Sequence, residues 1–428
     1  MDIINNKENI STKYDILIAI SKDSKDLEGY KSNSKNYYNF TNIKDFYSWI
    51  KKDKTINKDL KIGLINNIET ENVNDYVNLL EFYLYYKDVY KLCNRELKKY
   101  NDKLKDNHNP IIEEAINEFI RMNSEGKYIR AFLIALGYHM TNKKDNNYLP
   151  LAASYEIFQT AILIHDDYMD EATTRRTKPT IPVHYNEKYE TADKKERNHL
   201  SNSLAICIGD LGFFYATNII SEEYKDNTNL ANILSLYSRI QMNTVKGQLL
   251  DIELPFVSKY QNLNNTTSSV LEIYKYKTAW YSIIGPYLLG RAVATKEPSK
   301  IINALENLGI AFQIKDDLLG IYQDSSILGK DSNDISEFKQ TILYAYIKDN
   351  KKEYLQELLK YYGKKDLTTN DIETVRQIMS ESNAKEYAVS KMQELFKNSK
   401  EQINELTTDE RLKNILLGFI TYLELREN

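Results

Sequence analysis

The pattern of apolar and polar residues changes near residue 73. Residues 14–21 (YDILIAIS) and 60–65 (LKIGLI) are apolar runs typical of short strands, and residues 43–52 between them have a helical period. From about Val73 onward, apolar residues recur at helical spacing, and proline is absent before Pro110. The pattern predicts a small α/β N-terminal extension over residues 1–72 and an all-α domain over residues 73–428.

The segment LAASYEIFQTAILIHDD, residues 151–167, is apolar on nearly all sides. A helix of this kind is buried, so we expect it at the centre of a helical bundle. No clear strand pattern follows residue 70. Other helices are expected over residues 79–105, 200–220, 230–253, 269–294, 300–319 and 337–348.

Composition narrows the class of protein. The chain has 428 residues, 42% of them hydrophobic and 28% charged, and a net charge of −4, which argues against general nucleic-acid binding. Cys93 and Cys207 stand apart without other metal-ligand residues, which fits a reducing compartment. We find no secretory signal and no run of eighteen apolar residues, so a cytoplasmic protein without a transmembrane segment is expected.

Three acids, Asp166, Asp167 and Asp170, end the apolar segment. Residues four apart share one face of a helix, and two carboxylates about 4 Å apart repel by roughly 4 kcal/mol at an effective dielectric of about 20. A solvated acidic helix end is the simplest explanation. A second apolar helix ends in Asp316 and Asp317, however, and two such clusters favour opposite walls of one site for hard cations. Oxygen ligands without His or Cys clusters suit magnesium.

Basic residues flank both acid clusters. Magnesium is often bridged to phosphate oxygens, and arginine and lysine bind phosphate, so these positions predict where a phosphorylated substrate lies. There is neither a P-loop nor a dinucleotide glycine motif, which leaves a nucleotide kinase unsupported. The candidate cations are Lys127, Arg130, Arg175, Arg176, Lys277, Lys330 and Lys339.

Read in order, these motifs resemble the trans-isoprenyl diphosphate synthases, or polyprenyl synthetases, and especially the geranylgeranyl and farnesyl diphosphate synthases. HDDYMDEATTRRTKPT, residues 165–180, resembles the first aspartate-rich motif of that family, and FQIKDD, residues 312–317, resembles the second. The likeness covers about residues 75–428. It also includes GKYIR (126–130), CIGDLGF (207–213), KGQLLDIE (246–253), KT (277–278) and the sequence GKDSNDISEFKQT (329–341).

The resemblance implies an all-α isoprenoid-synthase bundle around a deep central cavity, a homodimer, and three Mg²⁺ ions per active site. By position, Asp166, Asp167, Asp170 and Asp316 would bind metal, with Asp317 supporting the second cluster. The allylic diphosphate would contact Arg175, Lys277, Thr278, Gln313, Lys330 and Lys339. Isopentenyl diphosphate would contact Gly126, Lys127, Arg130, Gln159 and Arg176.

The chain departs from the family pattern in two motifs. The pattern G-G-K-R-x-R-P is altered by Glu125, Tyr128 and Ala131, and Gly320 stands where many members have a third aspartate. The implied reaction is head-to-tail elongation, with an allylic cation attacked by the double bond of isopentenyl diphosphate. A class I terpene cyclase, a non-catalytic partner subunit and a helical scaffold remain alternatives.

In the family that the chain resembles, the growing tail extends away from the first aspartates along the helix that carries them, so the resemblance implies that side chains upstream of Asp166 set the product length. Ala161 lies about 7.5 Å and Phe158 about 12 Å down the helix axis, with Ile162 beside Ala161. A small residue at position 161 leaves room for the growing tail, and Phe158 is the first large side chain that would block it. The alternative is that Phe158 is an ordinary residue of the hydrophobic core. On this reading geranylgeranyl diphosphate is the main product, followed by farnesyl diphosphate.

Overall fold

The chain forms two compact units in the computed structural model. Unit 1 combines Met1–Val89 with Ile403–Glu427, and unit 2 is Tyr90–Gln402. The structure describes residues 2–5, 13–21, 34–53, 56–57, 59–67, 73–105, 109–124, 126–261, 266–323, 334–364, 366–406 and 409–426.

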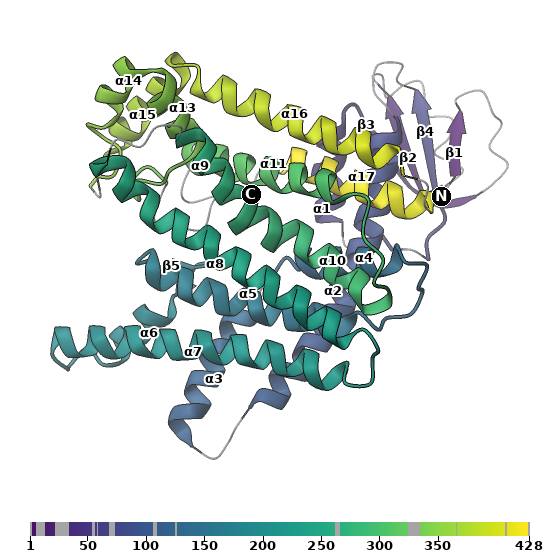
Figure 1. Ribbon diagram of the computed structural model, residues 1–428. Coiled ribbons are helices and arrows are strands. Elements are labelled where there is room, and N and C mark those ends of the chain that lie inside the picture. The colour runs from purple at the N-terminus through teal and green to yellow at the C-terminus, as the bar shows by residue number, and fades with distance from the viewer. Residues whose placement is uncertain are drawn as a thin grey trace. The chain divides into compact units, whose positions relative to one another are not determined.

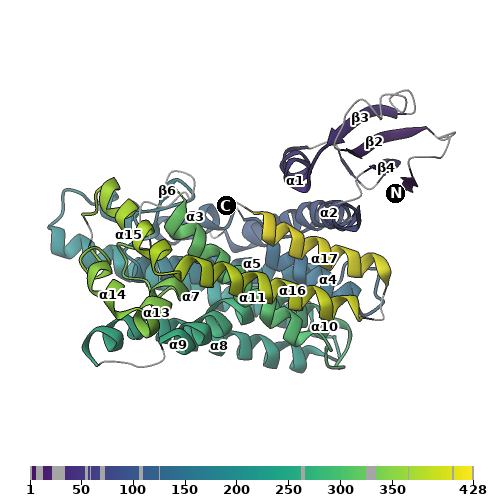
Figure 2. The same ribbon diagram turned by 90° about the horizontal axis from the view of Figure 1, so that it is seen from above.

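Unit 1 contains a parallel four-stranded sheet in the order β1-β4-β2-β3. The strands are β1 (Asp2–Asn5), β2 (Tyr14–Ser21), β3 (Ser34–Phe40) and β4 (Ile62–Asn67), and α1 (Ile43–Lys52) lies beside β3 (Figure 2). The predicted α/β extension is therefore present. Strands β1 and β3 were not predicted. Strand β1 is short, and β3, SKNYYNF, lacks a clear alternation of apolar and polar residues.

The C-terminal helix belongs to the same unit as this sheet. Helix α17 (Glu410–Leu425) packs against the first part of α2 (Val73–Leu104), where the ring of Phe82 contacts those of Phe419 and Tyr422 at 5.7 and 5.2 Å. Tyr47 of α1 contacts Tyr422 at 6.2 Å. The N-terminal part of the chain and the C-terminal helix thus share one aromatic core.

Unit 2 is built from helices (Figure 1). Its remaining elements are α3 (Pro110–Asn123), α4 (Ile129–His139), α5 (Leu149–Met169), α6 (Ile181–Lys188), α7 (Lys194–Glu223), α8 (Leu230–Tyr260), α9 (Thr266–Ile273), the π-helix η2 (Tyr274–Ile284), α10 (Gly285–Ala294), α11 (Ile302–Tyr322), α13 (Ile342–Asn350), α14 (Lys352–Leu358), α15 (Thr369–Glu381) and α16 (Ala384–Asn404). The all-α prediction is confirmed, apart from a hairpin of two-residue strands, β5 (Thr174–Arg175) and β6 (Lys178–Pro179).

The predicted helix over residues 269–294 is three segments, with η2 in the middle. Its neighbours approach closely because two facing residues are glycines. A Cβ on Gly247 of α8 would lie 2.3 Å from the backbone nitrogen of Lys277, and one on Gly309 of α11 would lie 2.4 Å from the Cβ of Ala279. π-Helical turns are frequent at functional sites, and η2 carries Lys277 and Thr278.

Helix α7 is the one described helix with the length and hydropathy to cross a membrane. Only 39% of its most apolar window is buried, yet it packs along α5 and α6 as a bundle helix does. The apolar composition of α7 is therefore compatible with a helix of a bundle and does not by itself indicate a membrane span.

Candidate functional site

The three acids at the end of α5 take different environments. Asp167 is 1% exposed and accepts a hydrogen bond from Arg175 Nε at 2.8 Å, while Asp166 is half-buried and lies 3.6 Å from Arg175 Nη2. Asp170 follows one turn later with its side chain exposed. The helix therefore directs Asp166 and Asp170 to the open side and uses Asp167 to hold Arg175.

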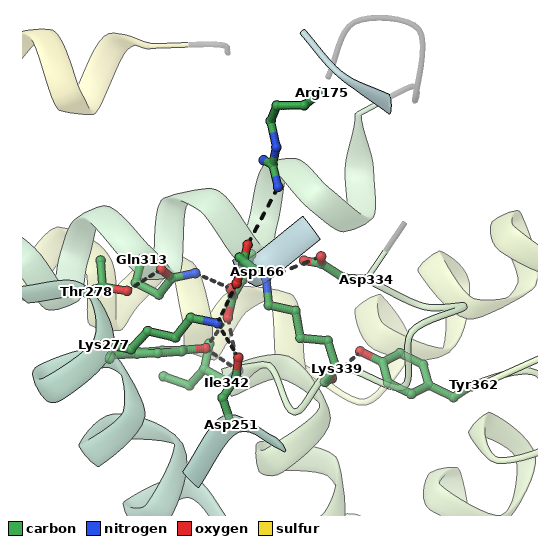
Figure 3. A network of polar contacts seen from close by, with 12 residues as sticks. Asp166, Arg175, Asp251, Lys277, Thr278, Gln313, Asp334, Lys339, Ile342 and Tyr362 are labelled. Atoms are coloured by element: carbon green, nitrogen blue, oxygen red, sulfur yellow. Dashed lines mark hydrogen bonds and ion pairs between the residues drawn. The ribbon is translucent and has the colours of Figure 1, made fainter. Parts of the chain in front are cut away.

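Lys277 of η2 joins α5 to α8. Its Nζ lies 2.5 Å from Asp251 and 3.6 Å from Asp166 (Figure 3). Burial would lower the pKa of Lys277, but the carboxylates of Asp251 and Asp166 outweigh it and raise that pKa, so the ammonium stays charged. Asp251 was not predicted as a site residue, although it lies in the quoted GQLLD motif, one helical turn after Gly247.

Asp317 is the centre of a second network. Its carboxylate accepts hydrogen bonds from the hydroxyl of Tyr274 and, at 3.0 Å, from Nε2 of Gln313. Thr278 donates to Gln313 Oε1 at 2.6 Å, and Tyr274 also accepts the backbone N–H of Ile342 at 2.7 Å. Burial raises the pKa of Asp317 to about 6, despite the opposing effect of nearby Lys339. Both of its oxygens are engaged, which matches a supporting role.

Lys339 lies in the segment before α13 and is in the field of Asp317 of α11. Its Nζ lies 3.3 Å from Asp334, and its backbone carbonyl accepts a hydrogen bond from Tyr362 at 2.9 Å (Figure 3). Burial opposes its charge, but Asp334 and Asp317 outweigh that effect and raise the pKa of Lys339. The ammonium is thus fixed and charged beside the second acid pair.

Gly320 makes room for Asp334. A Cβ at position 320 would lie 2.4 Å from the Asp334 carboxylate oxygen. Gly320 is one turn after Asp316 on α11, where the family pattern often has an aspartate. A carboxylate from another segment therefore fills the space that this aspartate would need.

The adjacent arginines diverge because they belong to the β5–β6 hairpin. Arg176 and Thr177 both have positive φ, 53° and 64°, in the two-residue loop, the geometry of a type I′ turn. Arg175 binds Asp167, whereas Arg176 Nη1 donates to the Met122 carbonyl at 3.2 Å, at the end of α3. The two guanidiniums thus face different clusters.

A second cationic cluster forms around the start of α4. The guanidinium of Arg130 stacks over the ring of Tyr281 at 4.2 Å and donates to Ser282 Oγ at 2.8 Å. Its Nε is buried and has no hydrogen-bond partner within the described part of the chain. Glu156 of α5, which was not predicted as a site residue, lies close to Gly126 and is in the field of both Arg130 and Arg176.

The other predicted residues lie as follows. Gln159 and Asp316 are half-buried, and Lys127 is exposed in the segment before α4. Lys330 lies outside the residues that the structure describes. The structure therefore brings the allylic candidates Arg175, Lys277, Thr278, Gln313 and Lys339 into polar networks with the acids, whereas Arg130 contacts Tyr281 and Ser282.

Phe158 belongs to an aromatic cluster. Its ring centroid lies 5.3–5.9 Å from those of Tyr155, Phe213, Tyr237 and Tyr281. Ala161 is fully buried, and its Cβ would lie 2.9 Å from a Cβ on Gly212, so α7 occupies the room beside it. Ile162 is half-buried.

The carboxylates of the site can supply only some of the ligands that a magnesium ion needs, and a bound substrate would supply the others. No three Asp, Glu, His or Cys side chains among the described residues lie close enough to hold an ion by themselves. Desolvation, followed by repulsion from Asp166, nonetheless raises the pKa of Asp170 to about 7, although its side chain is exposed. Magnesium is commonly held by one or two carboxylates with water and phosphate oxygens, which this all-oxygen donor set can supply.

Known isoprenyl diphosphate synthases have sequences similar to this chain. The chain is 28% identical over 306 residues to a short chain isoprenyl diphosphate synthase of Methanocaldococcus jannaschii, covering 70% of this chain and 84% of that one. It is 25% identical to a geranylgeranyl diphosphate synthase of Sulfolobus acidocaldarius, covering 71% and 87%.

Solved structures show the same fold. A geranylgeranyl pyrophosphate synthase of Corynebacterium glutamicum, complexed with isoprenyl diphosphate and magnesium, superposes with a TM-score of 0.71 at 22% identity. The match covers 79% of this chain and 98% of that one. A farnesyl diphosphate synthase of T. brucei gives a TM-score of 0.66 at 20% identity, covering 80% and 99%.

Residues 109–379, more than half of the chain, match the polyprenyl synthetase family. This match includes both acid clusters, Lys277 and the cluster at Arg130. By its sequence and its fold, the chain belongs to the polyprenyl synthetase family.

Proposed function

We propose that the chain is a short-chain prenyltransferase that joins isopentenyl diphosphate head-to-tail to allylic diphosphates. The observation that carries this proposal is the presence of two sets of cations with different partners, one at Lys277 and Lys339 and one at Arg130. A terpene cyclase acts on a single diphosphate and has no need of the second cluster, so two substrates are favoured. The names of the relatives support the same activity.

In the proposed reaction, Arg175, Lys277 and Lys339 hold the allylic diphosphate and stabilise the charge that develops as its C–O bond breaks. Bound Mg²⁺, three ions per site in our proposal, would supply further charge neutralisation between the acid clusters at Asp166, Asp170 and Asp316. Arg130 and Arg176 orient isopentenyl diphosphate, whose double bond attacks the allylic cation. The proton that is then lost goes to the released diphosphate, so the chain needs no dedicated base.

We also propose that residues 1–72 form an extension outside the synthase domain, since the family match begins at residue 109. The cytoplasmic location rests on the scarcity of cysteine, and the expected lack of nucleic-acid binding rests on the net charge of −4.

A homodimer is supported by an apolar stripe on α8. Met242, Val245, Leu249, Ile252, Phe256 and Tyr260 recur every three or four residues, and each side chain is at least 46% exposed. Phe214 on neighbouring α7 is 73% exposed. A continuous apolar stripe at helical spacing is typical of a helix that packs on a partner, and we propose a second copy of this chain.

The first prediction concerns metal dependence. Chelation should abolish elongation and added Mg²⁺ should restore it, because the acid clusters repel diphosphate without a bridging cation. Asp166→Asn should lower kcat by on the order of a hundredfold or more. Calorimetry with Mg²⁺ and inorganic diphosphate should show weaker binding by this variant. Asp226→Asn, an exposed acid on α7's C-terminal side, is the control. Full activity in excess chelator would contradict the proposal.

The second prediction concerns Gly320. Gly320→Asp should lower both the melting temperature and the activity, because its Cβ meets the Asp334 carboxylate at 2.4 Å. Asp334→Gly should weaken the binding of diphosphate, because Lys339 loses its ion pair. Combining the two changes returns one carboxylate to the same space and should recover stability and activity relative to either single variant. Additive losses in the double variant would show that the two positions are independent.

The third prediction concerns product length. Ile162→Phe should shorten the main product from geranylgeranyl to farnesyl diphosphate, because position 162 is half-buried and a larger ring there would take up room in the proposed tail pocket. Phe158→Ala should lengthen the product by opening the aromatic cluster. It should also cost about 3–5 kcal/mol of stability as a core truncation, as should Phe132→Ala, a matched control on α4. Chromatography of the dephosphorylated products measures the chain length. Unchanged lengths in both test variants would show that this helix does not determine product length.

The fourth prediction concerns assembly. Leu249→Glu, at the middle of the stripe, should convert a dimer into a monomer, because it places a charge in an apolar interface. Ile111→Glu on α3, a change at a residue that is 72% exposed, should leave the dimer intact. Analytical ultracentrifugation measures both. A wild-type chain that sediments as a monomer would contradict the proposed homodimer without affecting the proposed reaction.

A further inference from the structure

Glu156 is a buried carboxylate with no part in the proposed reaction. It lies on α5, only 3% exposed, about 15 Å along the helix axis from Asp166. Burial raises its pKa to about 7, although Arg130, the Ala131 N–H and Arg176 oppose that shift. A buried carboxylate is costly unless it is paired, so its surroundings should show what it does.

The carboxylate of Glu156 caps a neighbouring helix. Helix α4 begins at Ile129, and its N-cap residue, Tyr128, makes no side-chain capping hydrogen bond and has a left-handed backbone. The first N–H groups of a helix need acceptors from outside, and its positive end favours an anion. Glu156 Oε1 accepts the N–H of Ala131, in the first turn of α4, at 3.1 Å. An acidic side chain from α5 thus supplies a cap that α4 lacks.

This contact depends on one of the departures from the family motif. Ala131 stands where the pattern G-G-K-R-x-R-P has proline, and proline has no N–H to donate. Alanine at this position creates a donor, and Glu156 accepts from it. The altered motif and the buried acid are therefore parts of one arrangement in this chain.

Glu156 also lies among charges of the second cationic cluster. Arg130 is the residue immediately before Ala131, so the cap fixes the backbone that carries its guanidinium over Tyr281. The titratable groups that interact electrostatically with Glu156 come from several elements: Cys93 of α2, Tyr128 and Arg130 at the start of α4, Tyr155 of α5, Arg176 of the hairpin loop and Tyr281 of η2. In its ionised form, Glu156 interacts favourably with both arginines.

We propose that Glu156 is a positioning residue: it caps α4, balances Arg130 and Arg176, and so aims these cations at the diphosphate of the second substrate. The inference rests on the proposed function, because it assigns isopentenyl diphosphate to this cluster. The proposed role of Glu156 is limited to the binding of isopentenyl diphosphate. Ionisation of the allylic diphosphate depends on the cluster at Lys277.

Two substitutions separate the cap from the charge. Glu156→Gln keeps an oxygen that can accept the Ala131 N–H but removes the charge, whereas Glu156→Leu removes both. The KM for isopentenyl diphosphate should rise on the order of tenfold in the leucine variant and less in the glutamine variant. The KM for the allylic diphosphate and kcat should stay within about twofold, because Lys277, Lys339 and Asp166 are untouched.

Ala131→Pro tests the hydrogen bond from the other side. It removes the donor, and in that background Glu156→Leu should raise the KM for isopentenyl diphosphate less than it does in the wild type, since contacting residues are not additive. Full additivity of the two changes would overturn the capping argument. The glutamine variant, which keeps the shape of the side chain, provides the test if the leucine variant does not fold.

Ser154→Ala is the matched control. Ser154 is fully buried on the same helix and donates to the Ala216 carbonyl of α7 at 2.7 Å, away from α4. It should lower the melting temperature without changing the KM for isopentenyl diphosphate. If Glu156 and Ser154 variants alter both substrates' KM values alike, the role of Glu156 is structural and the inference is wrong. If the wild type elongates no allylic diphosphate, the proposed function fails instead.

Discussion

The polar centre of unit 2 depends on a balance between partly buried carboxylates and the cations that face them. Lys277 lies between Asp251 and Asp166, Arg175 binds Asp167, and Lys339 pairs with Asp334. In each pair the acid and the cation lie on different segments or turns of the chain. The pair can form only when these parts of the chain pack closely together. The charges therefore do more than bind a ligand: they fix how α5, α8, η2 and α11 meet, because an unpaired charge in this place would be costly.

Close backbone approach is what brings these charges together. Lys277 can stand between α5 and α8 because Gly247 lets α8 come against the backbone of η2, and Gly309 does the same for α11. The π-helical winding of η2 then carries Lys277 and Thr278 to the two acid networks, and Tyr281 to the arginine cluster. A side chain at either glycine would push the helices apart and lengthen the contacts on which both clusters depend.

The sequence predicts much of this arrangement, and what it misses has physical causes. Helical period and the two acid motifs predict the bundle and most of the charged residues, since such features are local in sequence. The role of Glu156 and the position of Asp334 beside Gly320 were not predicted, because the Ala131 N–H and the missing side chain at Gly320 are features of other segments. The sequence also does not predict that the side chains of Arg175 and Arg176 point to different clusters. Their directions depend on a hairpin loop in which two residues other than glycine have positive φ angles.

Helix α8 links the site to the outer surface. One of its sides carries Gly247 and Asp251, which meet Lys277, and another carries the exposed stripe that includes Val245, Leu249 and Ile252. A partner on the stripe would remove apolar area from water and so hold α8 more firmly along its length. Since Asp251 can balance Lys277 only when α8 stays against η2, packing on the stripe would also stabilise the charge balance at the site. Through such a partner, the apolar outer side of α8 would contribute to the geometry of its inner side.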